Sequence, residues 1–270
     1  MSEDDDISEN RRSADVPAPK PTPMGLLVID KPLRRSSMDV CRAVRRRLVA
    51  GGAPKRVKVG HGGTLDPLAT GVLVILVGKA TPLCERIMQG QKVYEARVDL
   101  SAFSTTDDAE GERTVVAAAP VERGALEAAC AKFVGTVMQT PPIYSAMKVA
   151  GRRAYDLARK GHEVVLQPRL VRIDAIEVMA YAWPVAELRV TCGKGTYIRS
   201  LARDLGVALG TGGMLAGLRR TRVGEFGIER AVTVESLPQV MGQADLLAVP
   251  PGLAPPADFA DPTDPAATAS

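Results

Sequence analysis

The chain has 270 residues, of which 46% are hydrophobic and 24% are charged, and its formal net charge is +4. This composition excludes a fibrous or wholly disordered protein, and the length suits one large domain or two small ones. No apolar run approaches the length of a membrane-spanning helix, so a membrane protein is not expected.

Both ends of the chain differ in composition from the part between them. Residues 1–23 begin with an acidic run and end in alternating prolines, and residues 246–270 are mostly Ala, Pro and Asp. We expect a disordered tail at each end, with the folded domain over residues 24–245. Each tail carries a net charge of −3, so the chain at +4 leaves a domain of +10.

The first elements predicted are a buried strand and an amphipathic helix. The apolar run after Gly25 is a strand candidate, and Ser36-Ser37 supplies N-cap oxygens for a helix that Gly51-Gly52 ends. One helix face carries Val40, Cys41, Val44 and Leu48, and the opposite face carries arginines. This pattern predicts a helix that covers a sheet.

Basic residues gather on this helix and in the segments that flank it: Arg34, Arg35, Arg42, Arg45, Arg46, Arg47, Lys55, Arg56 and Lys58. Such a cluster attracts polyanions over a long range and favours nucleic acid as a partner. A solvated helix face followed by a basic loop has the same composition. Charge alone does not decide between the two interpretations.

A carboxylate then follows on a turn that glycines frame. Gly60-His-Gly-Gly63 gives the backbone freedom, whereas Pro67 restricts Asp66 to an extended conformation. Such a turn can present one side chain in a fixed direction at a sheet edge. From the spacing alone, an ordinary loop with an Asx-type turn is the better supported interpretation.

The remaining segments predict more strands, one further helical pattern and a basic insertion. Val72–Val77 is a buried-strand candidate, and Val93–Leu100 alternates so that Tyr94 points the same way as core residues. Leu126, Ala129, Cys130 and Phe133 recur at helical spacing. Residues 136–168 mix Pro, Gly, Arg and Lys, and so long an excursion from a compact domain is usually functional.

The last clear pattern is a strand, a glycine turn and a helix. Val185–Cys192 alternates, Gly193-Lys-Gly195 breaks the strand, and a helix begins near Tyr197. Tyr197 and Arg199 therefore fall in its first turn, where side chains can point at a ligand beyond the strand end. The order of elements predicts an α+β fold with a mixed sheet rather than a doubly wound parallel one.

Familiar metal and nucleotide motifs are not found in the sequence. Its two histidines, His61 and His162, cannot form a multi-histidine zinc site, and neither a G-x-x-x-x-G-K-[ST] loop nor a dinucleotide-binding glycine motif occurs. Cys41, Cys84, Cys130 and Cys192 have no C-x-x-C spacing and read as reduced thiols. With an N-terminus unlike a signal peptide, this predicts a cytoplasmic protein.

The run Gly60-His-Gly-Gly-Thr-Leu-Asp-Pro-Leu-Ala-Thr-Gly-Val-Leu73 closely resembles the catalytic motif of the TruB family of pseudouridine synthases. Further matching segments follow in family order: Asp30-Lys-Pro32 with Ser36-Ser37, Lys92-Val-Tyr-Glu95, Pro141 to Lys148, Gly151 to Asp156, Gly195 to Ser200 and Leu218-Arg-Arg-Thr221. The resemblance implies a pseudouridine synthase fold, in which helices flank a mixed, largely antiparallel sheet and residues 136–168 form a basic thumb. It also implies an isomerase without cofactor or metal.

The resemblance assigns catalytic roles to Asp66, Arg199 and Tyr94. Asp66 is the carboxylate that activates the nucleoside, and Arg199 pairs with it and fixes its orientation. Tyr94 is expected to stack on the flipped base and to help remove the proton from C5. Whether Asp66 adds to the base, bonds to ribose C1′ or takes a C2′ proton stays open. Without the resemblance, a core tyrosine and a surface arginine are the ordinary alternatives.

Other residues are implicated in holding the substrate. Tyr197 and Leu218 match pocket-lining positions of the family, and His61 matches the residue that fills the gap left by the flipped nucleotide. Asp108 is a further candidate for the network around Asp66 and Arg199. Lys148, Arg152 and Arg153 belong to the thumb, which is expected to close over the T-arm of tRNA and to contact phosphates. The expected target is uridine 55 of the T loop.

Two departures from the family pattern bear on structure. Arg34 stands where the family usually has glycine, and the C-terminal residues do not resemble the small RNA-binding PUA domain of many relatives, so that domain is expected to be absent or vestigial. Two alternative functions stay open: the catalytic subunit of a guide-RNA pseudouridylation complex, and a tRNA-folding chaperone that acts mainly by binding the tRNA elbow. A monomer is expected.

Overall fold

The computed structural model describes residues 22–144, 148–149, 152–153 and 166–253. Most of the two predicted tails, residues 1–21 and 254–270, lies outside the described residues. No helix in the described part is long and apolar enough to cross a membrane.

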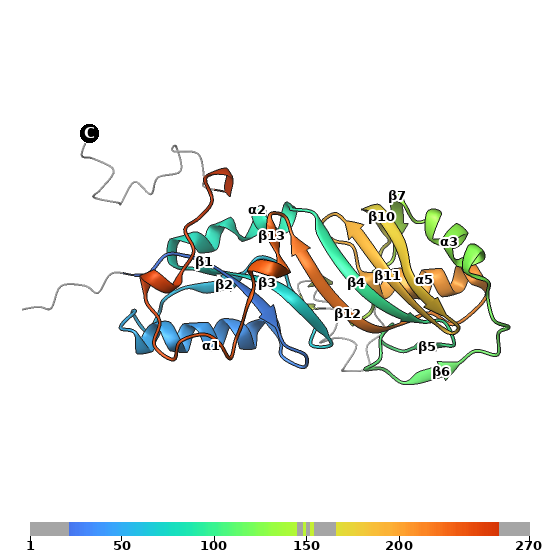
Figure 1. Ribbon diagram of the computed structural model, residues 1–270, viewed down its shortest axis with the longest axis horizontal. Coiled ribbons are helices and arrows are strands. Elements are labelled where there is room, and N and C mark those ends of the chain that lie inside the picture. The colour runs from blue at the N-terminus through green and yellow to red at the C-terminus, as the bar shows by residue number, and fades with distance from the viewer. Residues whose placement is uncertain (1–21, 145–147, 150–151, 154–165, 254–270) are drawn as a thin grey trace, which may run out of the picture.

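Within the described residues the core is a mixed sheet of ten strands (Figure 1), in the order β14-β1-β3-β12-β4-β11-β10-β7, with β2 paired to β3 and β13 to β12. The strands are β1 Gly25–Lys31, β2 Val59–His61, β3 Ala69–Val77, β4 Lys92–Asp99, β7 Gly135–Gln139, β10 Arg169–Ala182, β11 Val185–Cys192, β12 Met214–Val223, β13 Phe226–Gly227 and β14 Val232–Thr233. Only β1–β14 and β3–β12 are parallel among these described pairs. The predicted α+β class and largely antiparallel sheet are confirmed.

Helices cover both faces of this sheet. α1 Ser37–Ala50, α3 Arg123–Ala131 and α5 Ile198–Leu209 pack into the larger apolar core on one face. The short helices η1 Gly78–Leu83 and α2 Cys84–Gln89 pack with β1 and β3 on the other face. Because α1 and α5 lie towards opposite ends of the sheet (Figure 1), a stretch of β4 and β12 stays open between them.

The helix predicted after Ser36 forms as expected. The Ser36 side chain accepts from Asp39 N, and the Asp39 carboxylate accepts from Ser36 N in return, so two of the free donors at the helix start are satisfied. The apolar face predicted for this helix is buried. Each such side chain contributes roughly 1.5–3 kcal/mol by leaving water. Ser37 was expected to share the capping role, but its hydroxyl bonds a different loop.

Three cysteines, Cys41, Cys130 and Cys192, are buried free thiols. Burial raises the pKa of each to about 11. Each therefore stays a neutral thiol near pH 7 and packs as a small apolar side chain.

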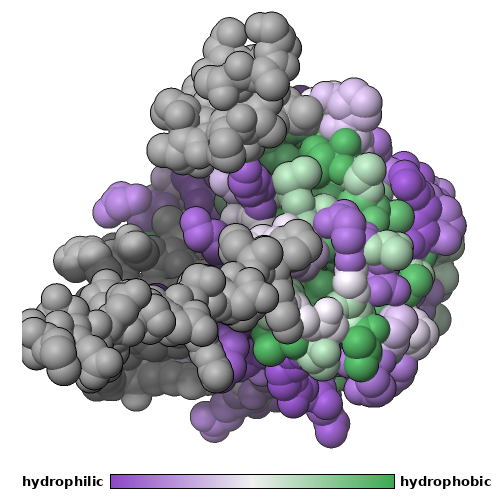
Figure 2. Space-filling view, turned by 90° about the vertical axis from the view of Figure 1, so that its left-hand side faces the viewer, coloured by the Kyte–Doolittle hydropathy of each residue, from purple (hydrophilic) through white to green (hydrophobic). Residues whose placement is uncertain are grey.

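The packed part of the chain extends past the C-terminal boundary predicted at residue 245. Leu246 is buried, and Leu26 and Leu247 exchange two backbone hydrogen bonds of 2.9 Å. Described structure continues to a short 3-10 helix, Pro251–Leu253. The proline-rich composition concealed this segment because its pairing partner lies more than 200 residues earlier in the chain. Figure 2 looks onto the end of the molecule that carries α1 and α2, where hydrophobic residues gather in the right-hand part of the view with hydrophilic ones among and around them.

The predicted basic insertion also begins later than expected. Residues 135–139 form β7, an edge strand of the main sheet that pairs with β10 from Arg169 onward. The insertion therefore leaves the sheet after Gln139 and returns at Arg169. Four of the five β7 residues are at least partly exposed, so the strand lacks the alternation that would predict it. A small hairpin, β8 Lys148–Val149 with β9 Arg152–Arg153, is the described part of its middle.

Arg34 stands where the resembled family usually has glycine, and its backbone is left-handed, with a φ of 64°. A side chain there costs about 1 kcal/mol, and more when it is branched at Cβ. We predict that Arg34→Gly does not lower the free energy of unfolding in urea, whereas Arg34→Val lowers it by about 1 kcal/mol. Arg35, which is exposed and has no positive φ, is the control. If Gly and Val change the free energy of unfolding in the same way at positions 34 and 35, the left-handed backbone at Arg34 is not the cause.

Candidate active site

Asp66 lies on the loop between β2 and β3, and elements on both sides hold this loop. The Ser37 hydroxyl donates to Leu65 O at 3.0 Å and accepts from Leu65 N at 2.9 Å. Arg34 N donates to Pro67 O at 2.8 Å. The residues before and after Asp66 are therefore both fixed, which sets the direction of its side chain.

A buried lysine lies beneath the same loop. Lys31 has no exposed surface, and its ammonium donates to Arg35 O at 2.7 Å, Pro32 O at 3.0 Å and Pro67 O at 3.5 Å. Burial lowers the pKa of Lys31 to about 8, and the negative charge of Asp66 opposes this shift. A buried ammonium is tolerated only when its donors are satisfied, and here one of its acceptors is the residue next to Asp66.

Arg220, on β12, holds the glycine-rich part of the loop from below. Only 2% of it is exposed, and its guanidinium donates to Val72 O at 2.8 Å, Gly63 O at 3.0 Å and Thr64 O at 3.4 Å. The close approach of β3 to β12 requires Gly71, whose φ is 101° and whose Cβ, if present, would lie 2.1 Å from Arg220 O. Arg220 thereby ties the loop to the sheet.

Arg199, in the first turn of α5, joins the loop to the other half of the molecule. Its Nη2 lies 2.8 Å from Asp66 Oδ2 and its Nη1 lies 3.5 Å from Asp108 Oδ2. It also donates to Thr106 O at 3.2 Å and to Tyr144 O at 3.0 Å. Arg199 is buried while the Asp66 side chain is 38% exposed, so the carboxylate faces open space with its cation fixed behind it.

Tyr94 and Lys92 come from β4, beside Arg220. Tyr94 is buried and is paired in register with Arg220. Burial raises the pKa of Tyr94, and the charge of Arg220 opposes that rise. Lys92 is buried as well and donates to Met88 O and Gly90 O. Burial, with a smaller contribution from Arg220, lowers the pKa of Lys92 to about 8.

Tyr197, the N-cap residue of α5, is held by the two residues that flank the insertion. The amide of Gln139 donates to Tyr197 O at 3.1 Å and accepts from Tyr197 N at 2.8 Å. The guanidinium carbon of Arg169 lies 5.1 Å from the centre of the Tyr197 ring. This distance is within the range of a cation–π contact.

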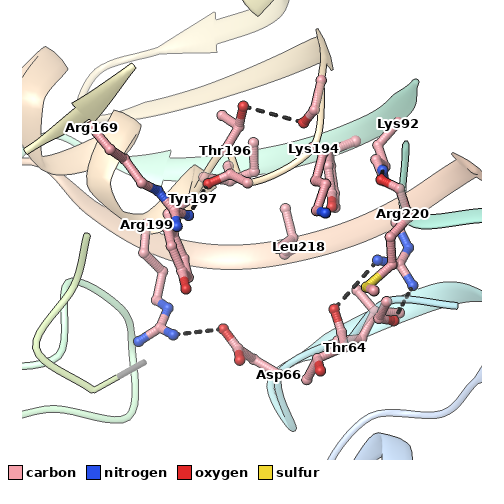
Figure 3. Close-up of a pocket in the computed structure, with 17 residues that line it drawn as sticks. Thr64, Asp66, Lys92, Arg169, Lys194, Thr196, Tyr197, Arg199, Leu218 and Arg220 are labelled. Carbon is pink, nitrogen blue, oxygen red and sulfur yellow. Dashed lines mark hydrogen bonds and ion pairs between the residues drawn. The ribbon is translucent and has the colours of Figure 1, made fainter. Parts of the chain in front are cut away.

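Together these residues surround a pocket of about 270 Å³ (Figure 3). Its lining consists of Gly63, Thr64, Leu65, Asp66, Met88, Lys92, Tyr94, Arg169, Gly193, Lys194, Gly195, Thr196, Tyr197, Ile198, Arg199, Leu218 and Arg220. In Figure 3, Asp66 and Arg199 meet at one side of the pocket, with Tyr197 above Arg199 and Leu218 near the centre of the view.

The structure brings most of the predicted site residues together. Asp66, Tyr94, Arg199, Tyr197 and Leu218 all line the pocket. Asp108, which is buried, lies behind Arg199 as the expected further member of the network.

His61 is the exception, because it does not line the pocket. It lies at the end of β2, paired with Ile75, and no hydrogen-bond partner for its buried Nδ1 is found among the described residues. Burial, with the charge of Arg220, lowers the pKa of His61. The side chains of Lys148, Arg152 and Arg153 lie outside the described structure, although their backbones form the β8–β9 hairpin.

Several pocket or loop residues were not predicted, among them the basic residues Lys31, Lys92, Arg169 and Arg220. Lys31, Lys92 and Arg220 stand in motifs that the sequence does reveal, but a basic residue in a strand is normally taken as exposed. The usable signal was that Lys31 ends a largely apolar strand, whereas the strands of Lys92 and Arg220 carry several other charged residues, so these two do not stand out. Arg169 left no signal, because it directly follows the predicted insertion, residues 136–168, and looked like one more basic residue beside it.

The arrangement favours a reaction in which one carboxylate acts on an anionic ligand. Among the described residues that line this pocket, Asp66 is the only acidic one, against five basic ones. No group of three or more His, Cys, Asp or Glu within the described residues could hold a metal ion. A carboxylate with a fixed arginine behind it can act as a nucleophile or base, and a buried phenol beside it can stack on a planar group.

Comparison with known proteins identifies two matching family profiles. Residues 47–198 match the TruB family pseudouridylate synthase N-terminal domain, and residues 199–248 match the tRNA pseudouridylate synthase B C-terminal domain. The tRNA pseudouridine synthase B of Phocaeicola vulgatus is 45% identical over 224 residues, which are 82% of this chain and 94% of that protein. The protein of the same name from Cupriavidus metallidurans is 46% identical over 236 residues, covering 87% and 72%.

Two solved structures are similar over most of this chain. A chain in the crystal structure of a Cbf5-Nop10-Gar1 complex is 29% identical, with a TM-score of 0.61, and the match covers 79% of this chain and 53% of that one. A chain of an H/ACA RNP bound to a substrate RNA containing 2′-deoxyuridine is 28% identical, with a TM-score of 0.58, covering 79% and 52%. This chain therefore spans about half the length of those two.

The position of Arg220 beneath the Asp66 loop leads to a prediction. Arg220→Met leaves three backbone carbonyls without their donor, so we expect the free energy of unfolding in urea to fall by about 3 kcal/mol. Arg220→Lys, which keeps the charge but has fewer donors, should lose less. Arg222→Met, at an exposed position of the same strand, is the control and should change stability little. Equal losses at positions 220 and 222 would contradict this role.

Proposed function

This chain belongs to the TruB family of pseudouridylate synthases, and on that premise we propose that it converts uridine 55 in the T loop of tRNA into pseudouridine. The observation that carries the proposal is the ion pair of 2.8 Å between Asp66 and Arg199, at the mouth of a pocket that also contains Tyr94, Tyr197 and Leu218. The relatives named tRNA pseudouridine synthase B support tRNA as the substrate.

The reaction is an isomerisation, so no oxidant, reductant or second substrate takes part. The N1–C1′ bond of uridine breaks, the uracil turns within the pocket, and a C5–C1′ bond forms. The proton on C5 leaves, and N1 gains one. A carboxylate that activates the nucleoside and a group that helps to remove the C5 proton meet these requirements, and we assign the roles to Asp66 and Tyr94.

Electrostatics support these assignments. Arg199 donates to Asp66 from a buried position, so it holds the carboxylate in one orientation by a charge-assisted hydrogen bond. Asp108, Thr106 O and Tyr144 O hold the rest of the guanidinium. A misplacement of about 1 Å in such a group can reduce a rate about 100-fold.

A stacked uridine cannot reach this pocket, so the nucleotide must flip out of the loop. Unstacking costs about a few kcal/mol, and we propose that His61 fills the gap and offsets part of this cost. The lowered pKa of His61 keeps its ring neutral at pH 7, which suits stacking better than proton transfer. Tyr197 and Leu218 would then hold the flipped base.

Affinity for the T-arm is proposed to come from the positively charged surface and the thumb. Phosphate contacts from Lys148, Arg152 and Arg153 would position the RNA without reading its sequence. The identity of 45% to a tRNA pseudouridine synthase B, against 29% to a chain of a Cbf5-Nop10-Gar1 complex, favours tRNA over a guide-RNA complex as the setting.

Release of tritium from tRNA labelled at C5 of its uridines tests the function directly. The purified chain alone should release tritium from a T-arm stem-loop, and Asp66→Asn should abolish turnover while RNA binding is kept. Asp245→Asn, outside the pocket lining, is the control for loss of one carboxylate. Binding without release by the wild type would favour the chaperone alternative, and activity only with a guide RNA and partner proteins would favour the complex. Normal turnover by Asp66→Asn would refute the site.

The thumb makes a separate prediction. The triple replacement of Lys148, Arg152 and Arg153 by Ala removes three phosphate contacts, so the slope of log affinity against log salt should become shallower by about 2 to 3. The measurement is equilibrium binding of T-arm RNA at several salt concentrations. Arg123, Arg189 and Arg230, replaced together by Ala, give a control with the same change of charge. If both triple variants show the same slope of log affinity against log salt, the thumb does not contact the RNA.

A further inference from the structure

The pocket has a strong excess of positive charge. Five of its lining residues are basic, namely Lys92, Arg169, Lys194, Arg199 and Arg220, and one, Asp66, is acidic. Uracil is neutral, so the base itself does not need this charge. The excess indicates that an anionic part of the ligand lies close by.

Four of the five cations already have partners within the protein. Arg199 pairs with Asp66, and Lys194 pairs with Glu85. Arg220 and Lys92 donate to backbone carbonyls of the Asp66 loop and of the turn before β4. Arg199, Arg220 and Lys92 each also hold a structural element, so these three are not well placed to change partners when a ligand enters, whereas the Lys194–Glu85 pair is exposed.

Arg169 differs from the other four. It is half-buried, and the acceptor found for it among the described residues is the backbone carbonyl Gly195 O, with no described carboxylate paired to it. A guanidinium has five donors in a planar fork, so most of its hydrogen-bonding capacity stays available. A partly buried guanidinium without an acid is a suitable site for an oxyanion.

The contacts of Arg169 hold it in one orientation. Its guanidinium lies over the Tyr197 ring and bonds Gly195 O, on the glycine turn before α5 (Figure 3). Tyr197 in turn is fixed at its backbone by both ends of the Gln139 amide. Gln139 and Arg169 are opposite each other in the β7–β10 pair. The two residues at which the insertion leaves and rejoins the sheet therefore hold the same tyrosine.

We propose that Arg169 binds the phosphodiester next to the flipped uridine while its guanidinium stacks on Tyr197. The inference rests on the function proposed above, in which Tyr197 contacts the flipped base. A phosphate and the base of one nucleotide are joined through a ribose, so a stacked arginine–tyrosine pair contacts both at once. Arg169 thereby fixes where along the strand the nucleotide enters, and it acts as a positioning residue outside the chemical step.

Binding to singly modified RNA tests this. Affinity of T-arm stem-loops is measured in the Asp66→Asn background, with Arg169, Arg169→Gln or Arg169→Lys, at several salt concentrations. Three RNAs are compared: the unmodified stem-loop, and stem-loops with a neutral methylphosphonate in place of the phosphate on the 5′ or the 3′ side of the target uridine. Arg189→Gln is the matched control, since Arg189 is partly exposed on the opposite face of the sheet and pairs with Glu177.

The expected result has three parts. Arg169→Gln weakens binding of unmodified RNA about tenfold and makes the salt slope shallower by about 1, while Arg169→Lys keeps the slope and part of the affinity. On one of the methylphosphonate RNAs, Arg169 and Arg169→Gln bind equally. In the background with Asp66 intact, Arg169→Gln raises KM and changes kcat less than threefold.

Other results overturn the proposal. An equal loss on all three RNAs, or a loss of affinity with an unchanged salt slope, would mean that Arg169 acts only through the fold. A loss no larger than that of Arg189→Gln would mean that Arg169 contacts no phosphate. If the protein that keeps Arg169 binds the T-arm stem-loop no better than an unrelated hairpin, the proposed function fails and this inference fails with it. Specific T-arm binding without an Arg169 effect refutes this inference alone.

Discussion

The ion pair between Arg199 and Asp66 connects the two halves of the molecule. Asp66 belongs to the half built on α1, β1 and β3, and Arg199 belongs to α5, which packs on the other end of the sheet. Through Thr106 O and Tyr144 O, the same guanidinium also holds the turn around Asp108 and the start of the insertion. Any displacement of α5 therefore moves the partner of the carboxylate, so the proposed role of Asp66 requires that the two halves keep their relative position.

Two other buried cations hold the carboxylate loop itself. Lys31 and Arg220 carry charge in an interior where an unpaired cation costs several kcal/mol, and they are satisfied chiefly by backbone carbonyls of this loop and its neighbours. Their arrangement fixes backbone positions around Asp66 rather than neutralising an acid. The same charges raise the local positive potential, which suits a pocket whose substrate is part of a polyanion.

Periodicity in the sequence predicted the elements that bury one face: the helix after Ser36, the strand around Tyr94 and the helix after Tyr197 were all confirmed. The edge strand β7 was missed because exposed residues leave no alternation, and the C-terminal contact of Leu247 was missed because it joins distant parts of the chain. The resemblance pointed to Asp66, Tyr94 and Arg199, and the fold brings them into one pocket. Arg169 and Arg220 could not be predicted, because their roles depend on strand pairing and not on residue type.

The most direct test of the central ion pair is the single-turnover rate of Arg199 variants on T-arm RNA. Arg199→Met, and to a lesser degree Arg199→Lys, should slow the chemical step about 100-fold or more while RNA affinity changes little, because the carboxylate loses its orientation. Arg203, one turn later on α5 and paired with Asp107 at 2.7 Å, provides the matched control, and Arg203→Met should react at close to the normal rate. Wild-type single-turnover rates for Arg199→Met would contradict the account.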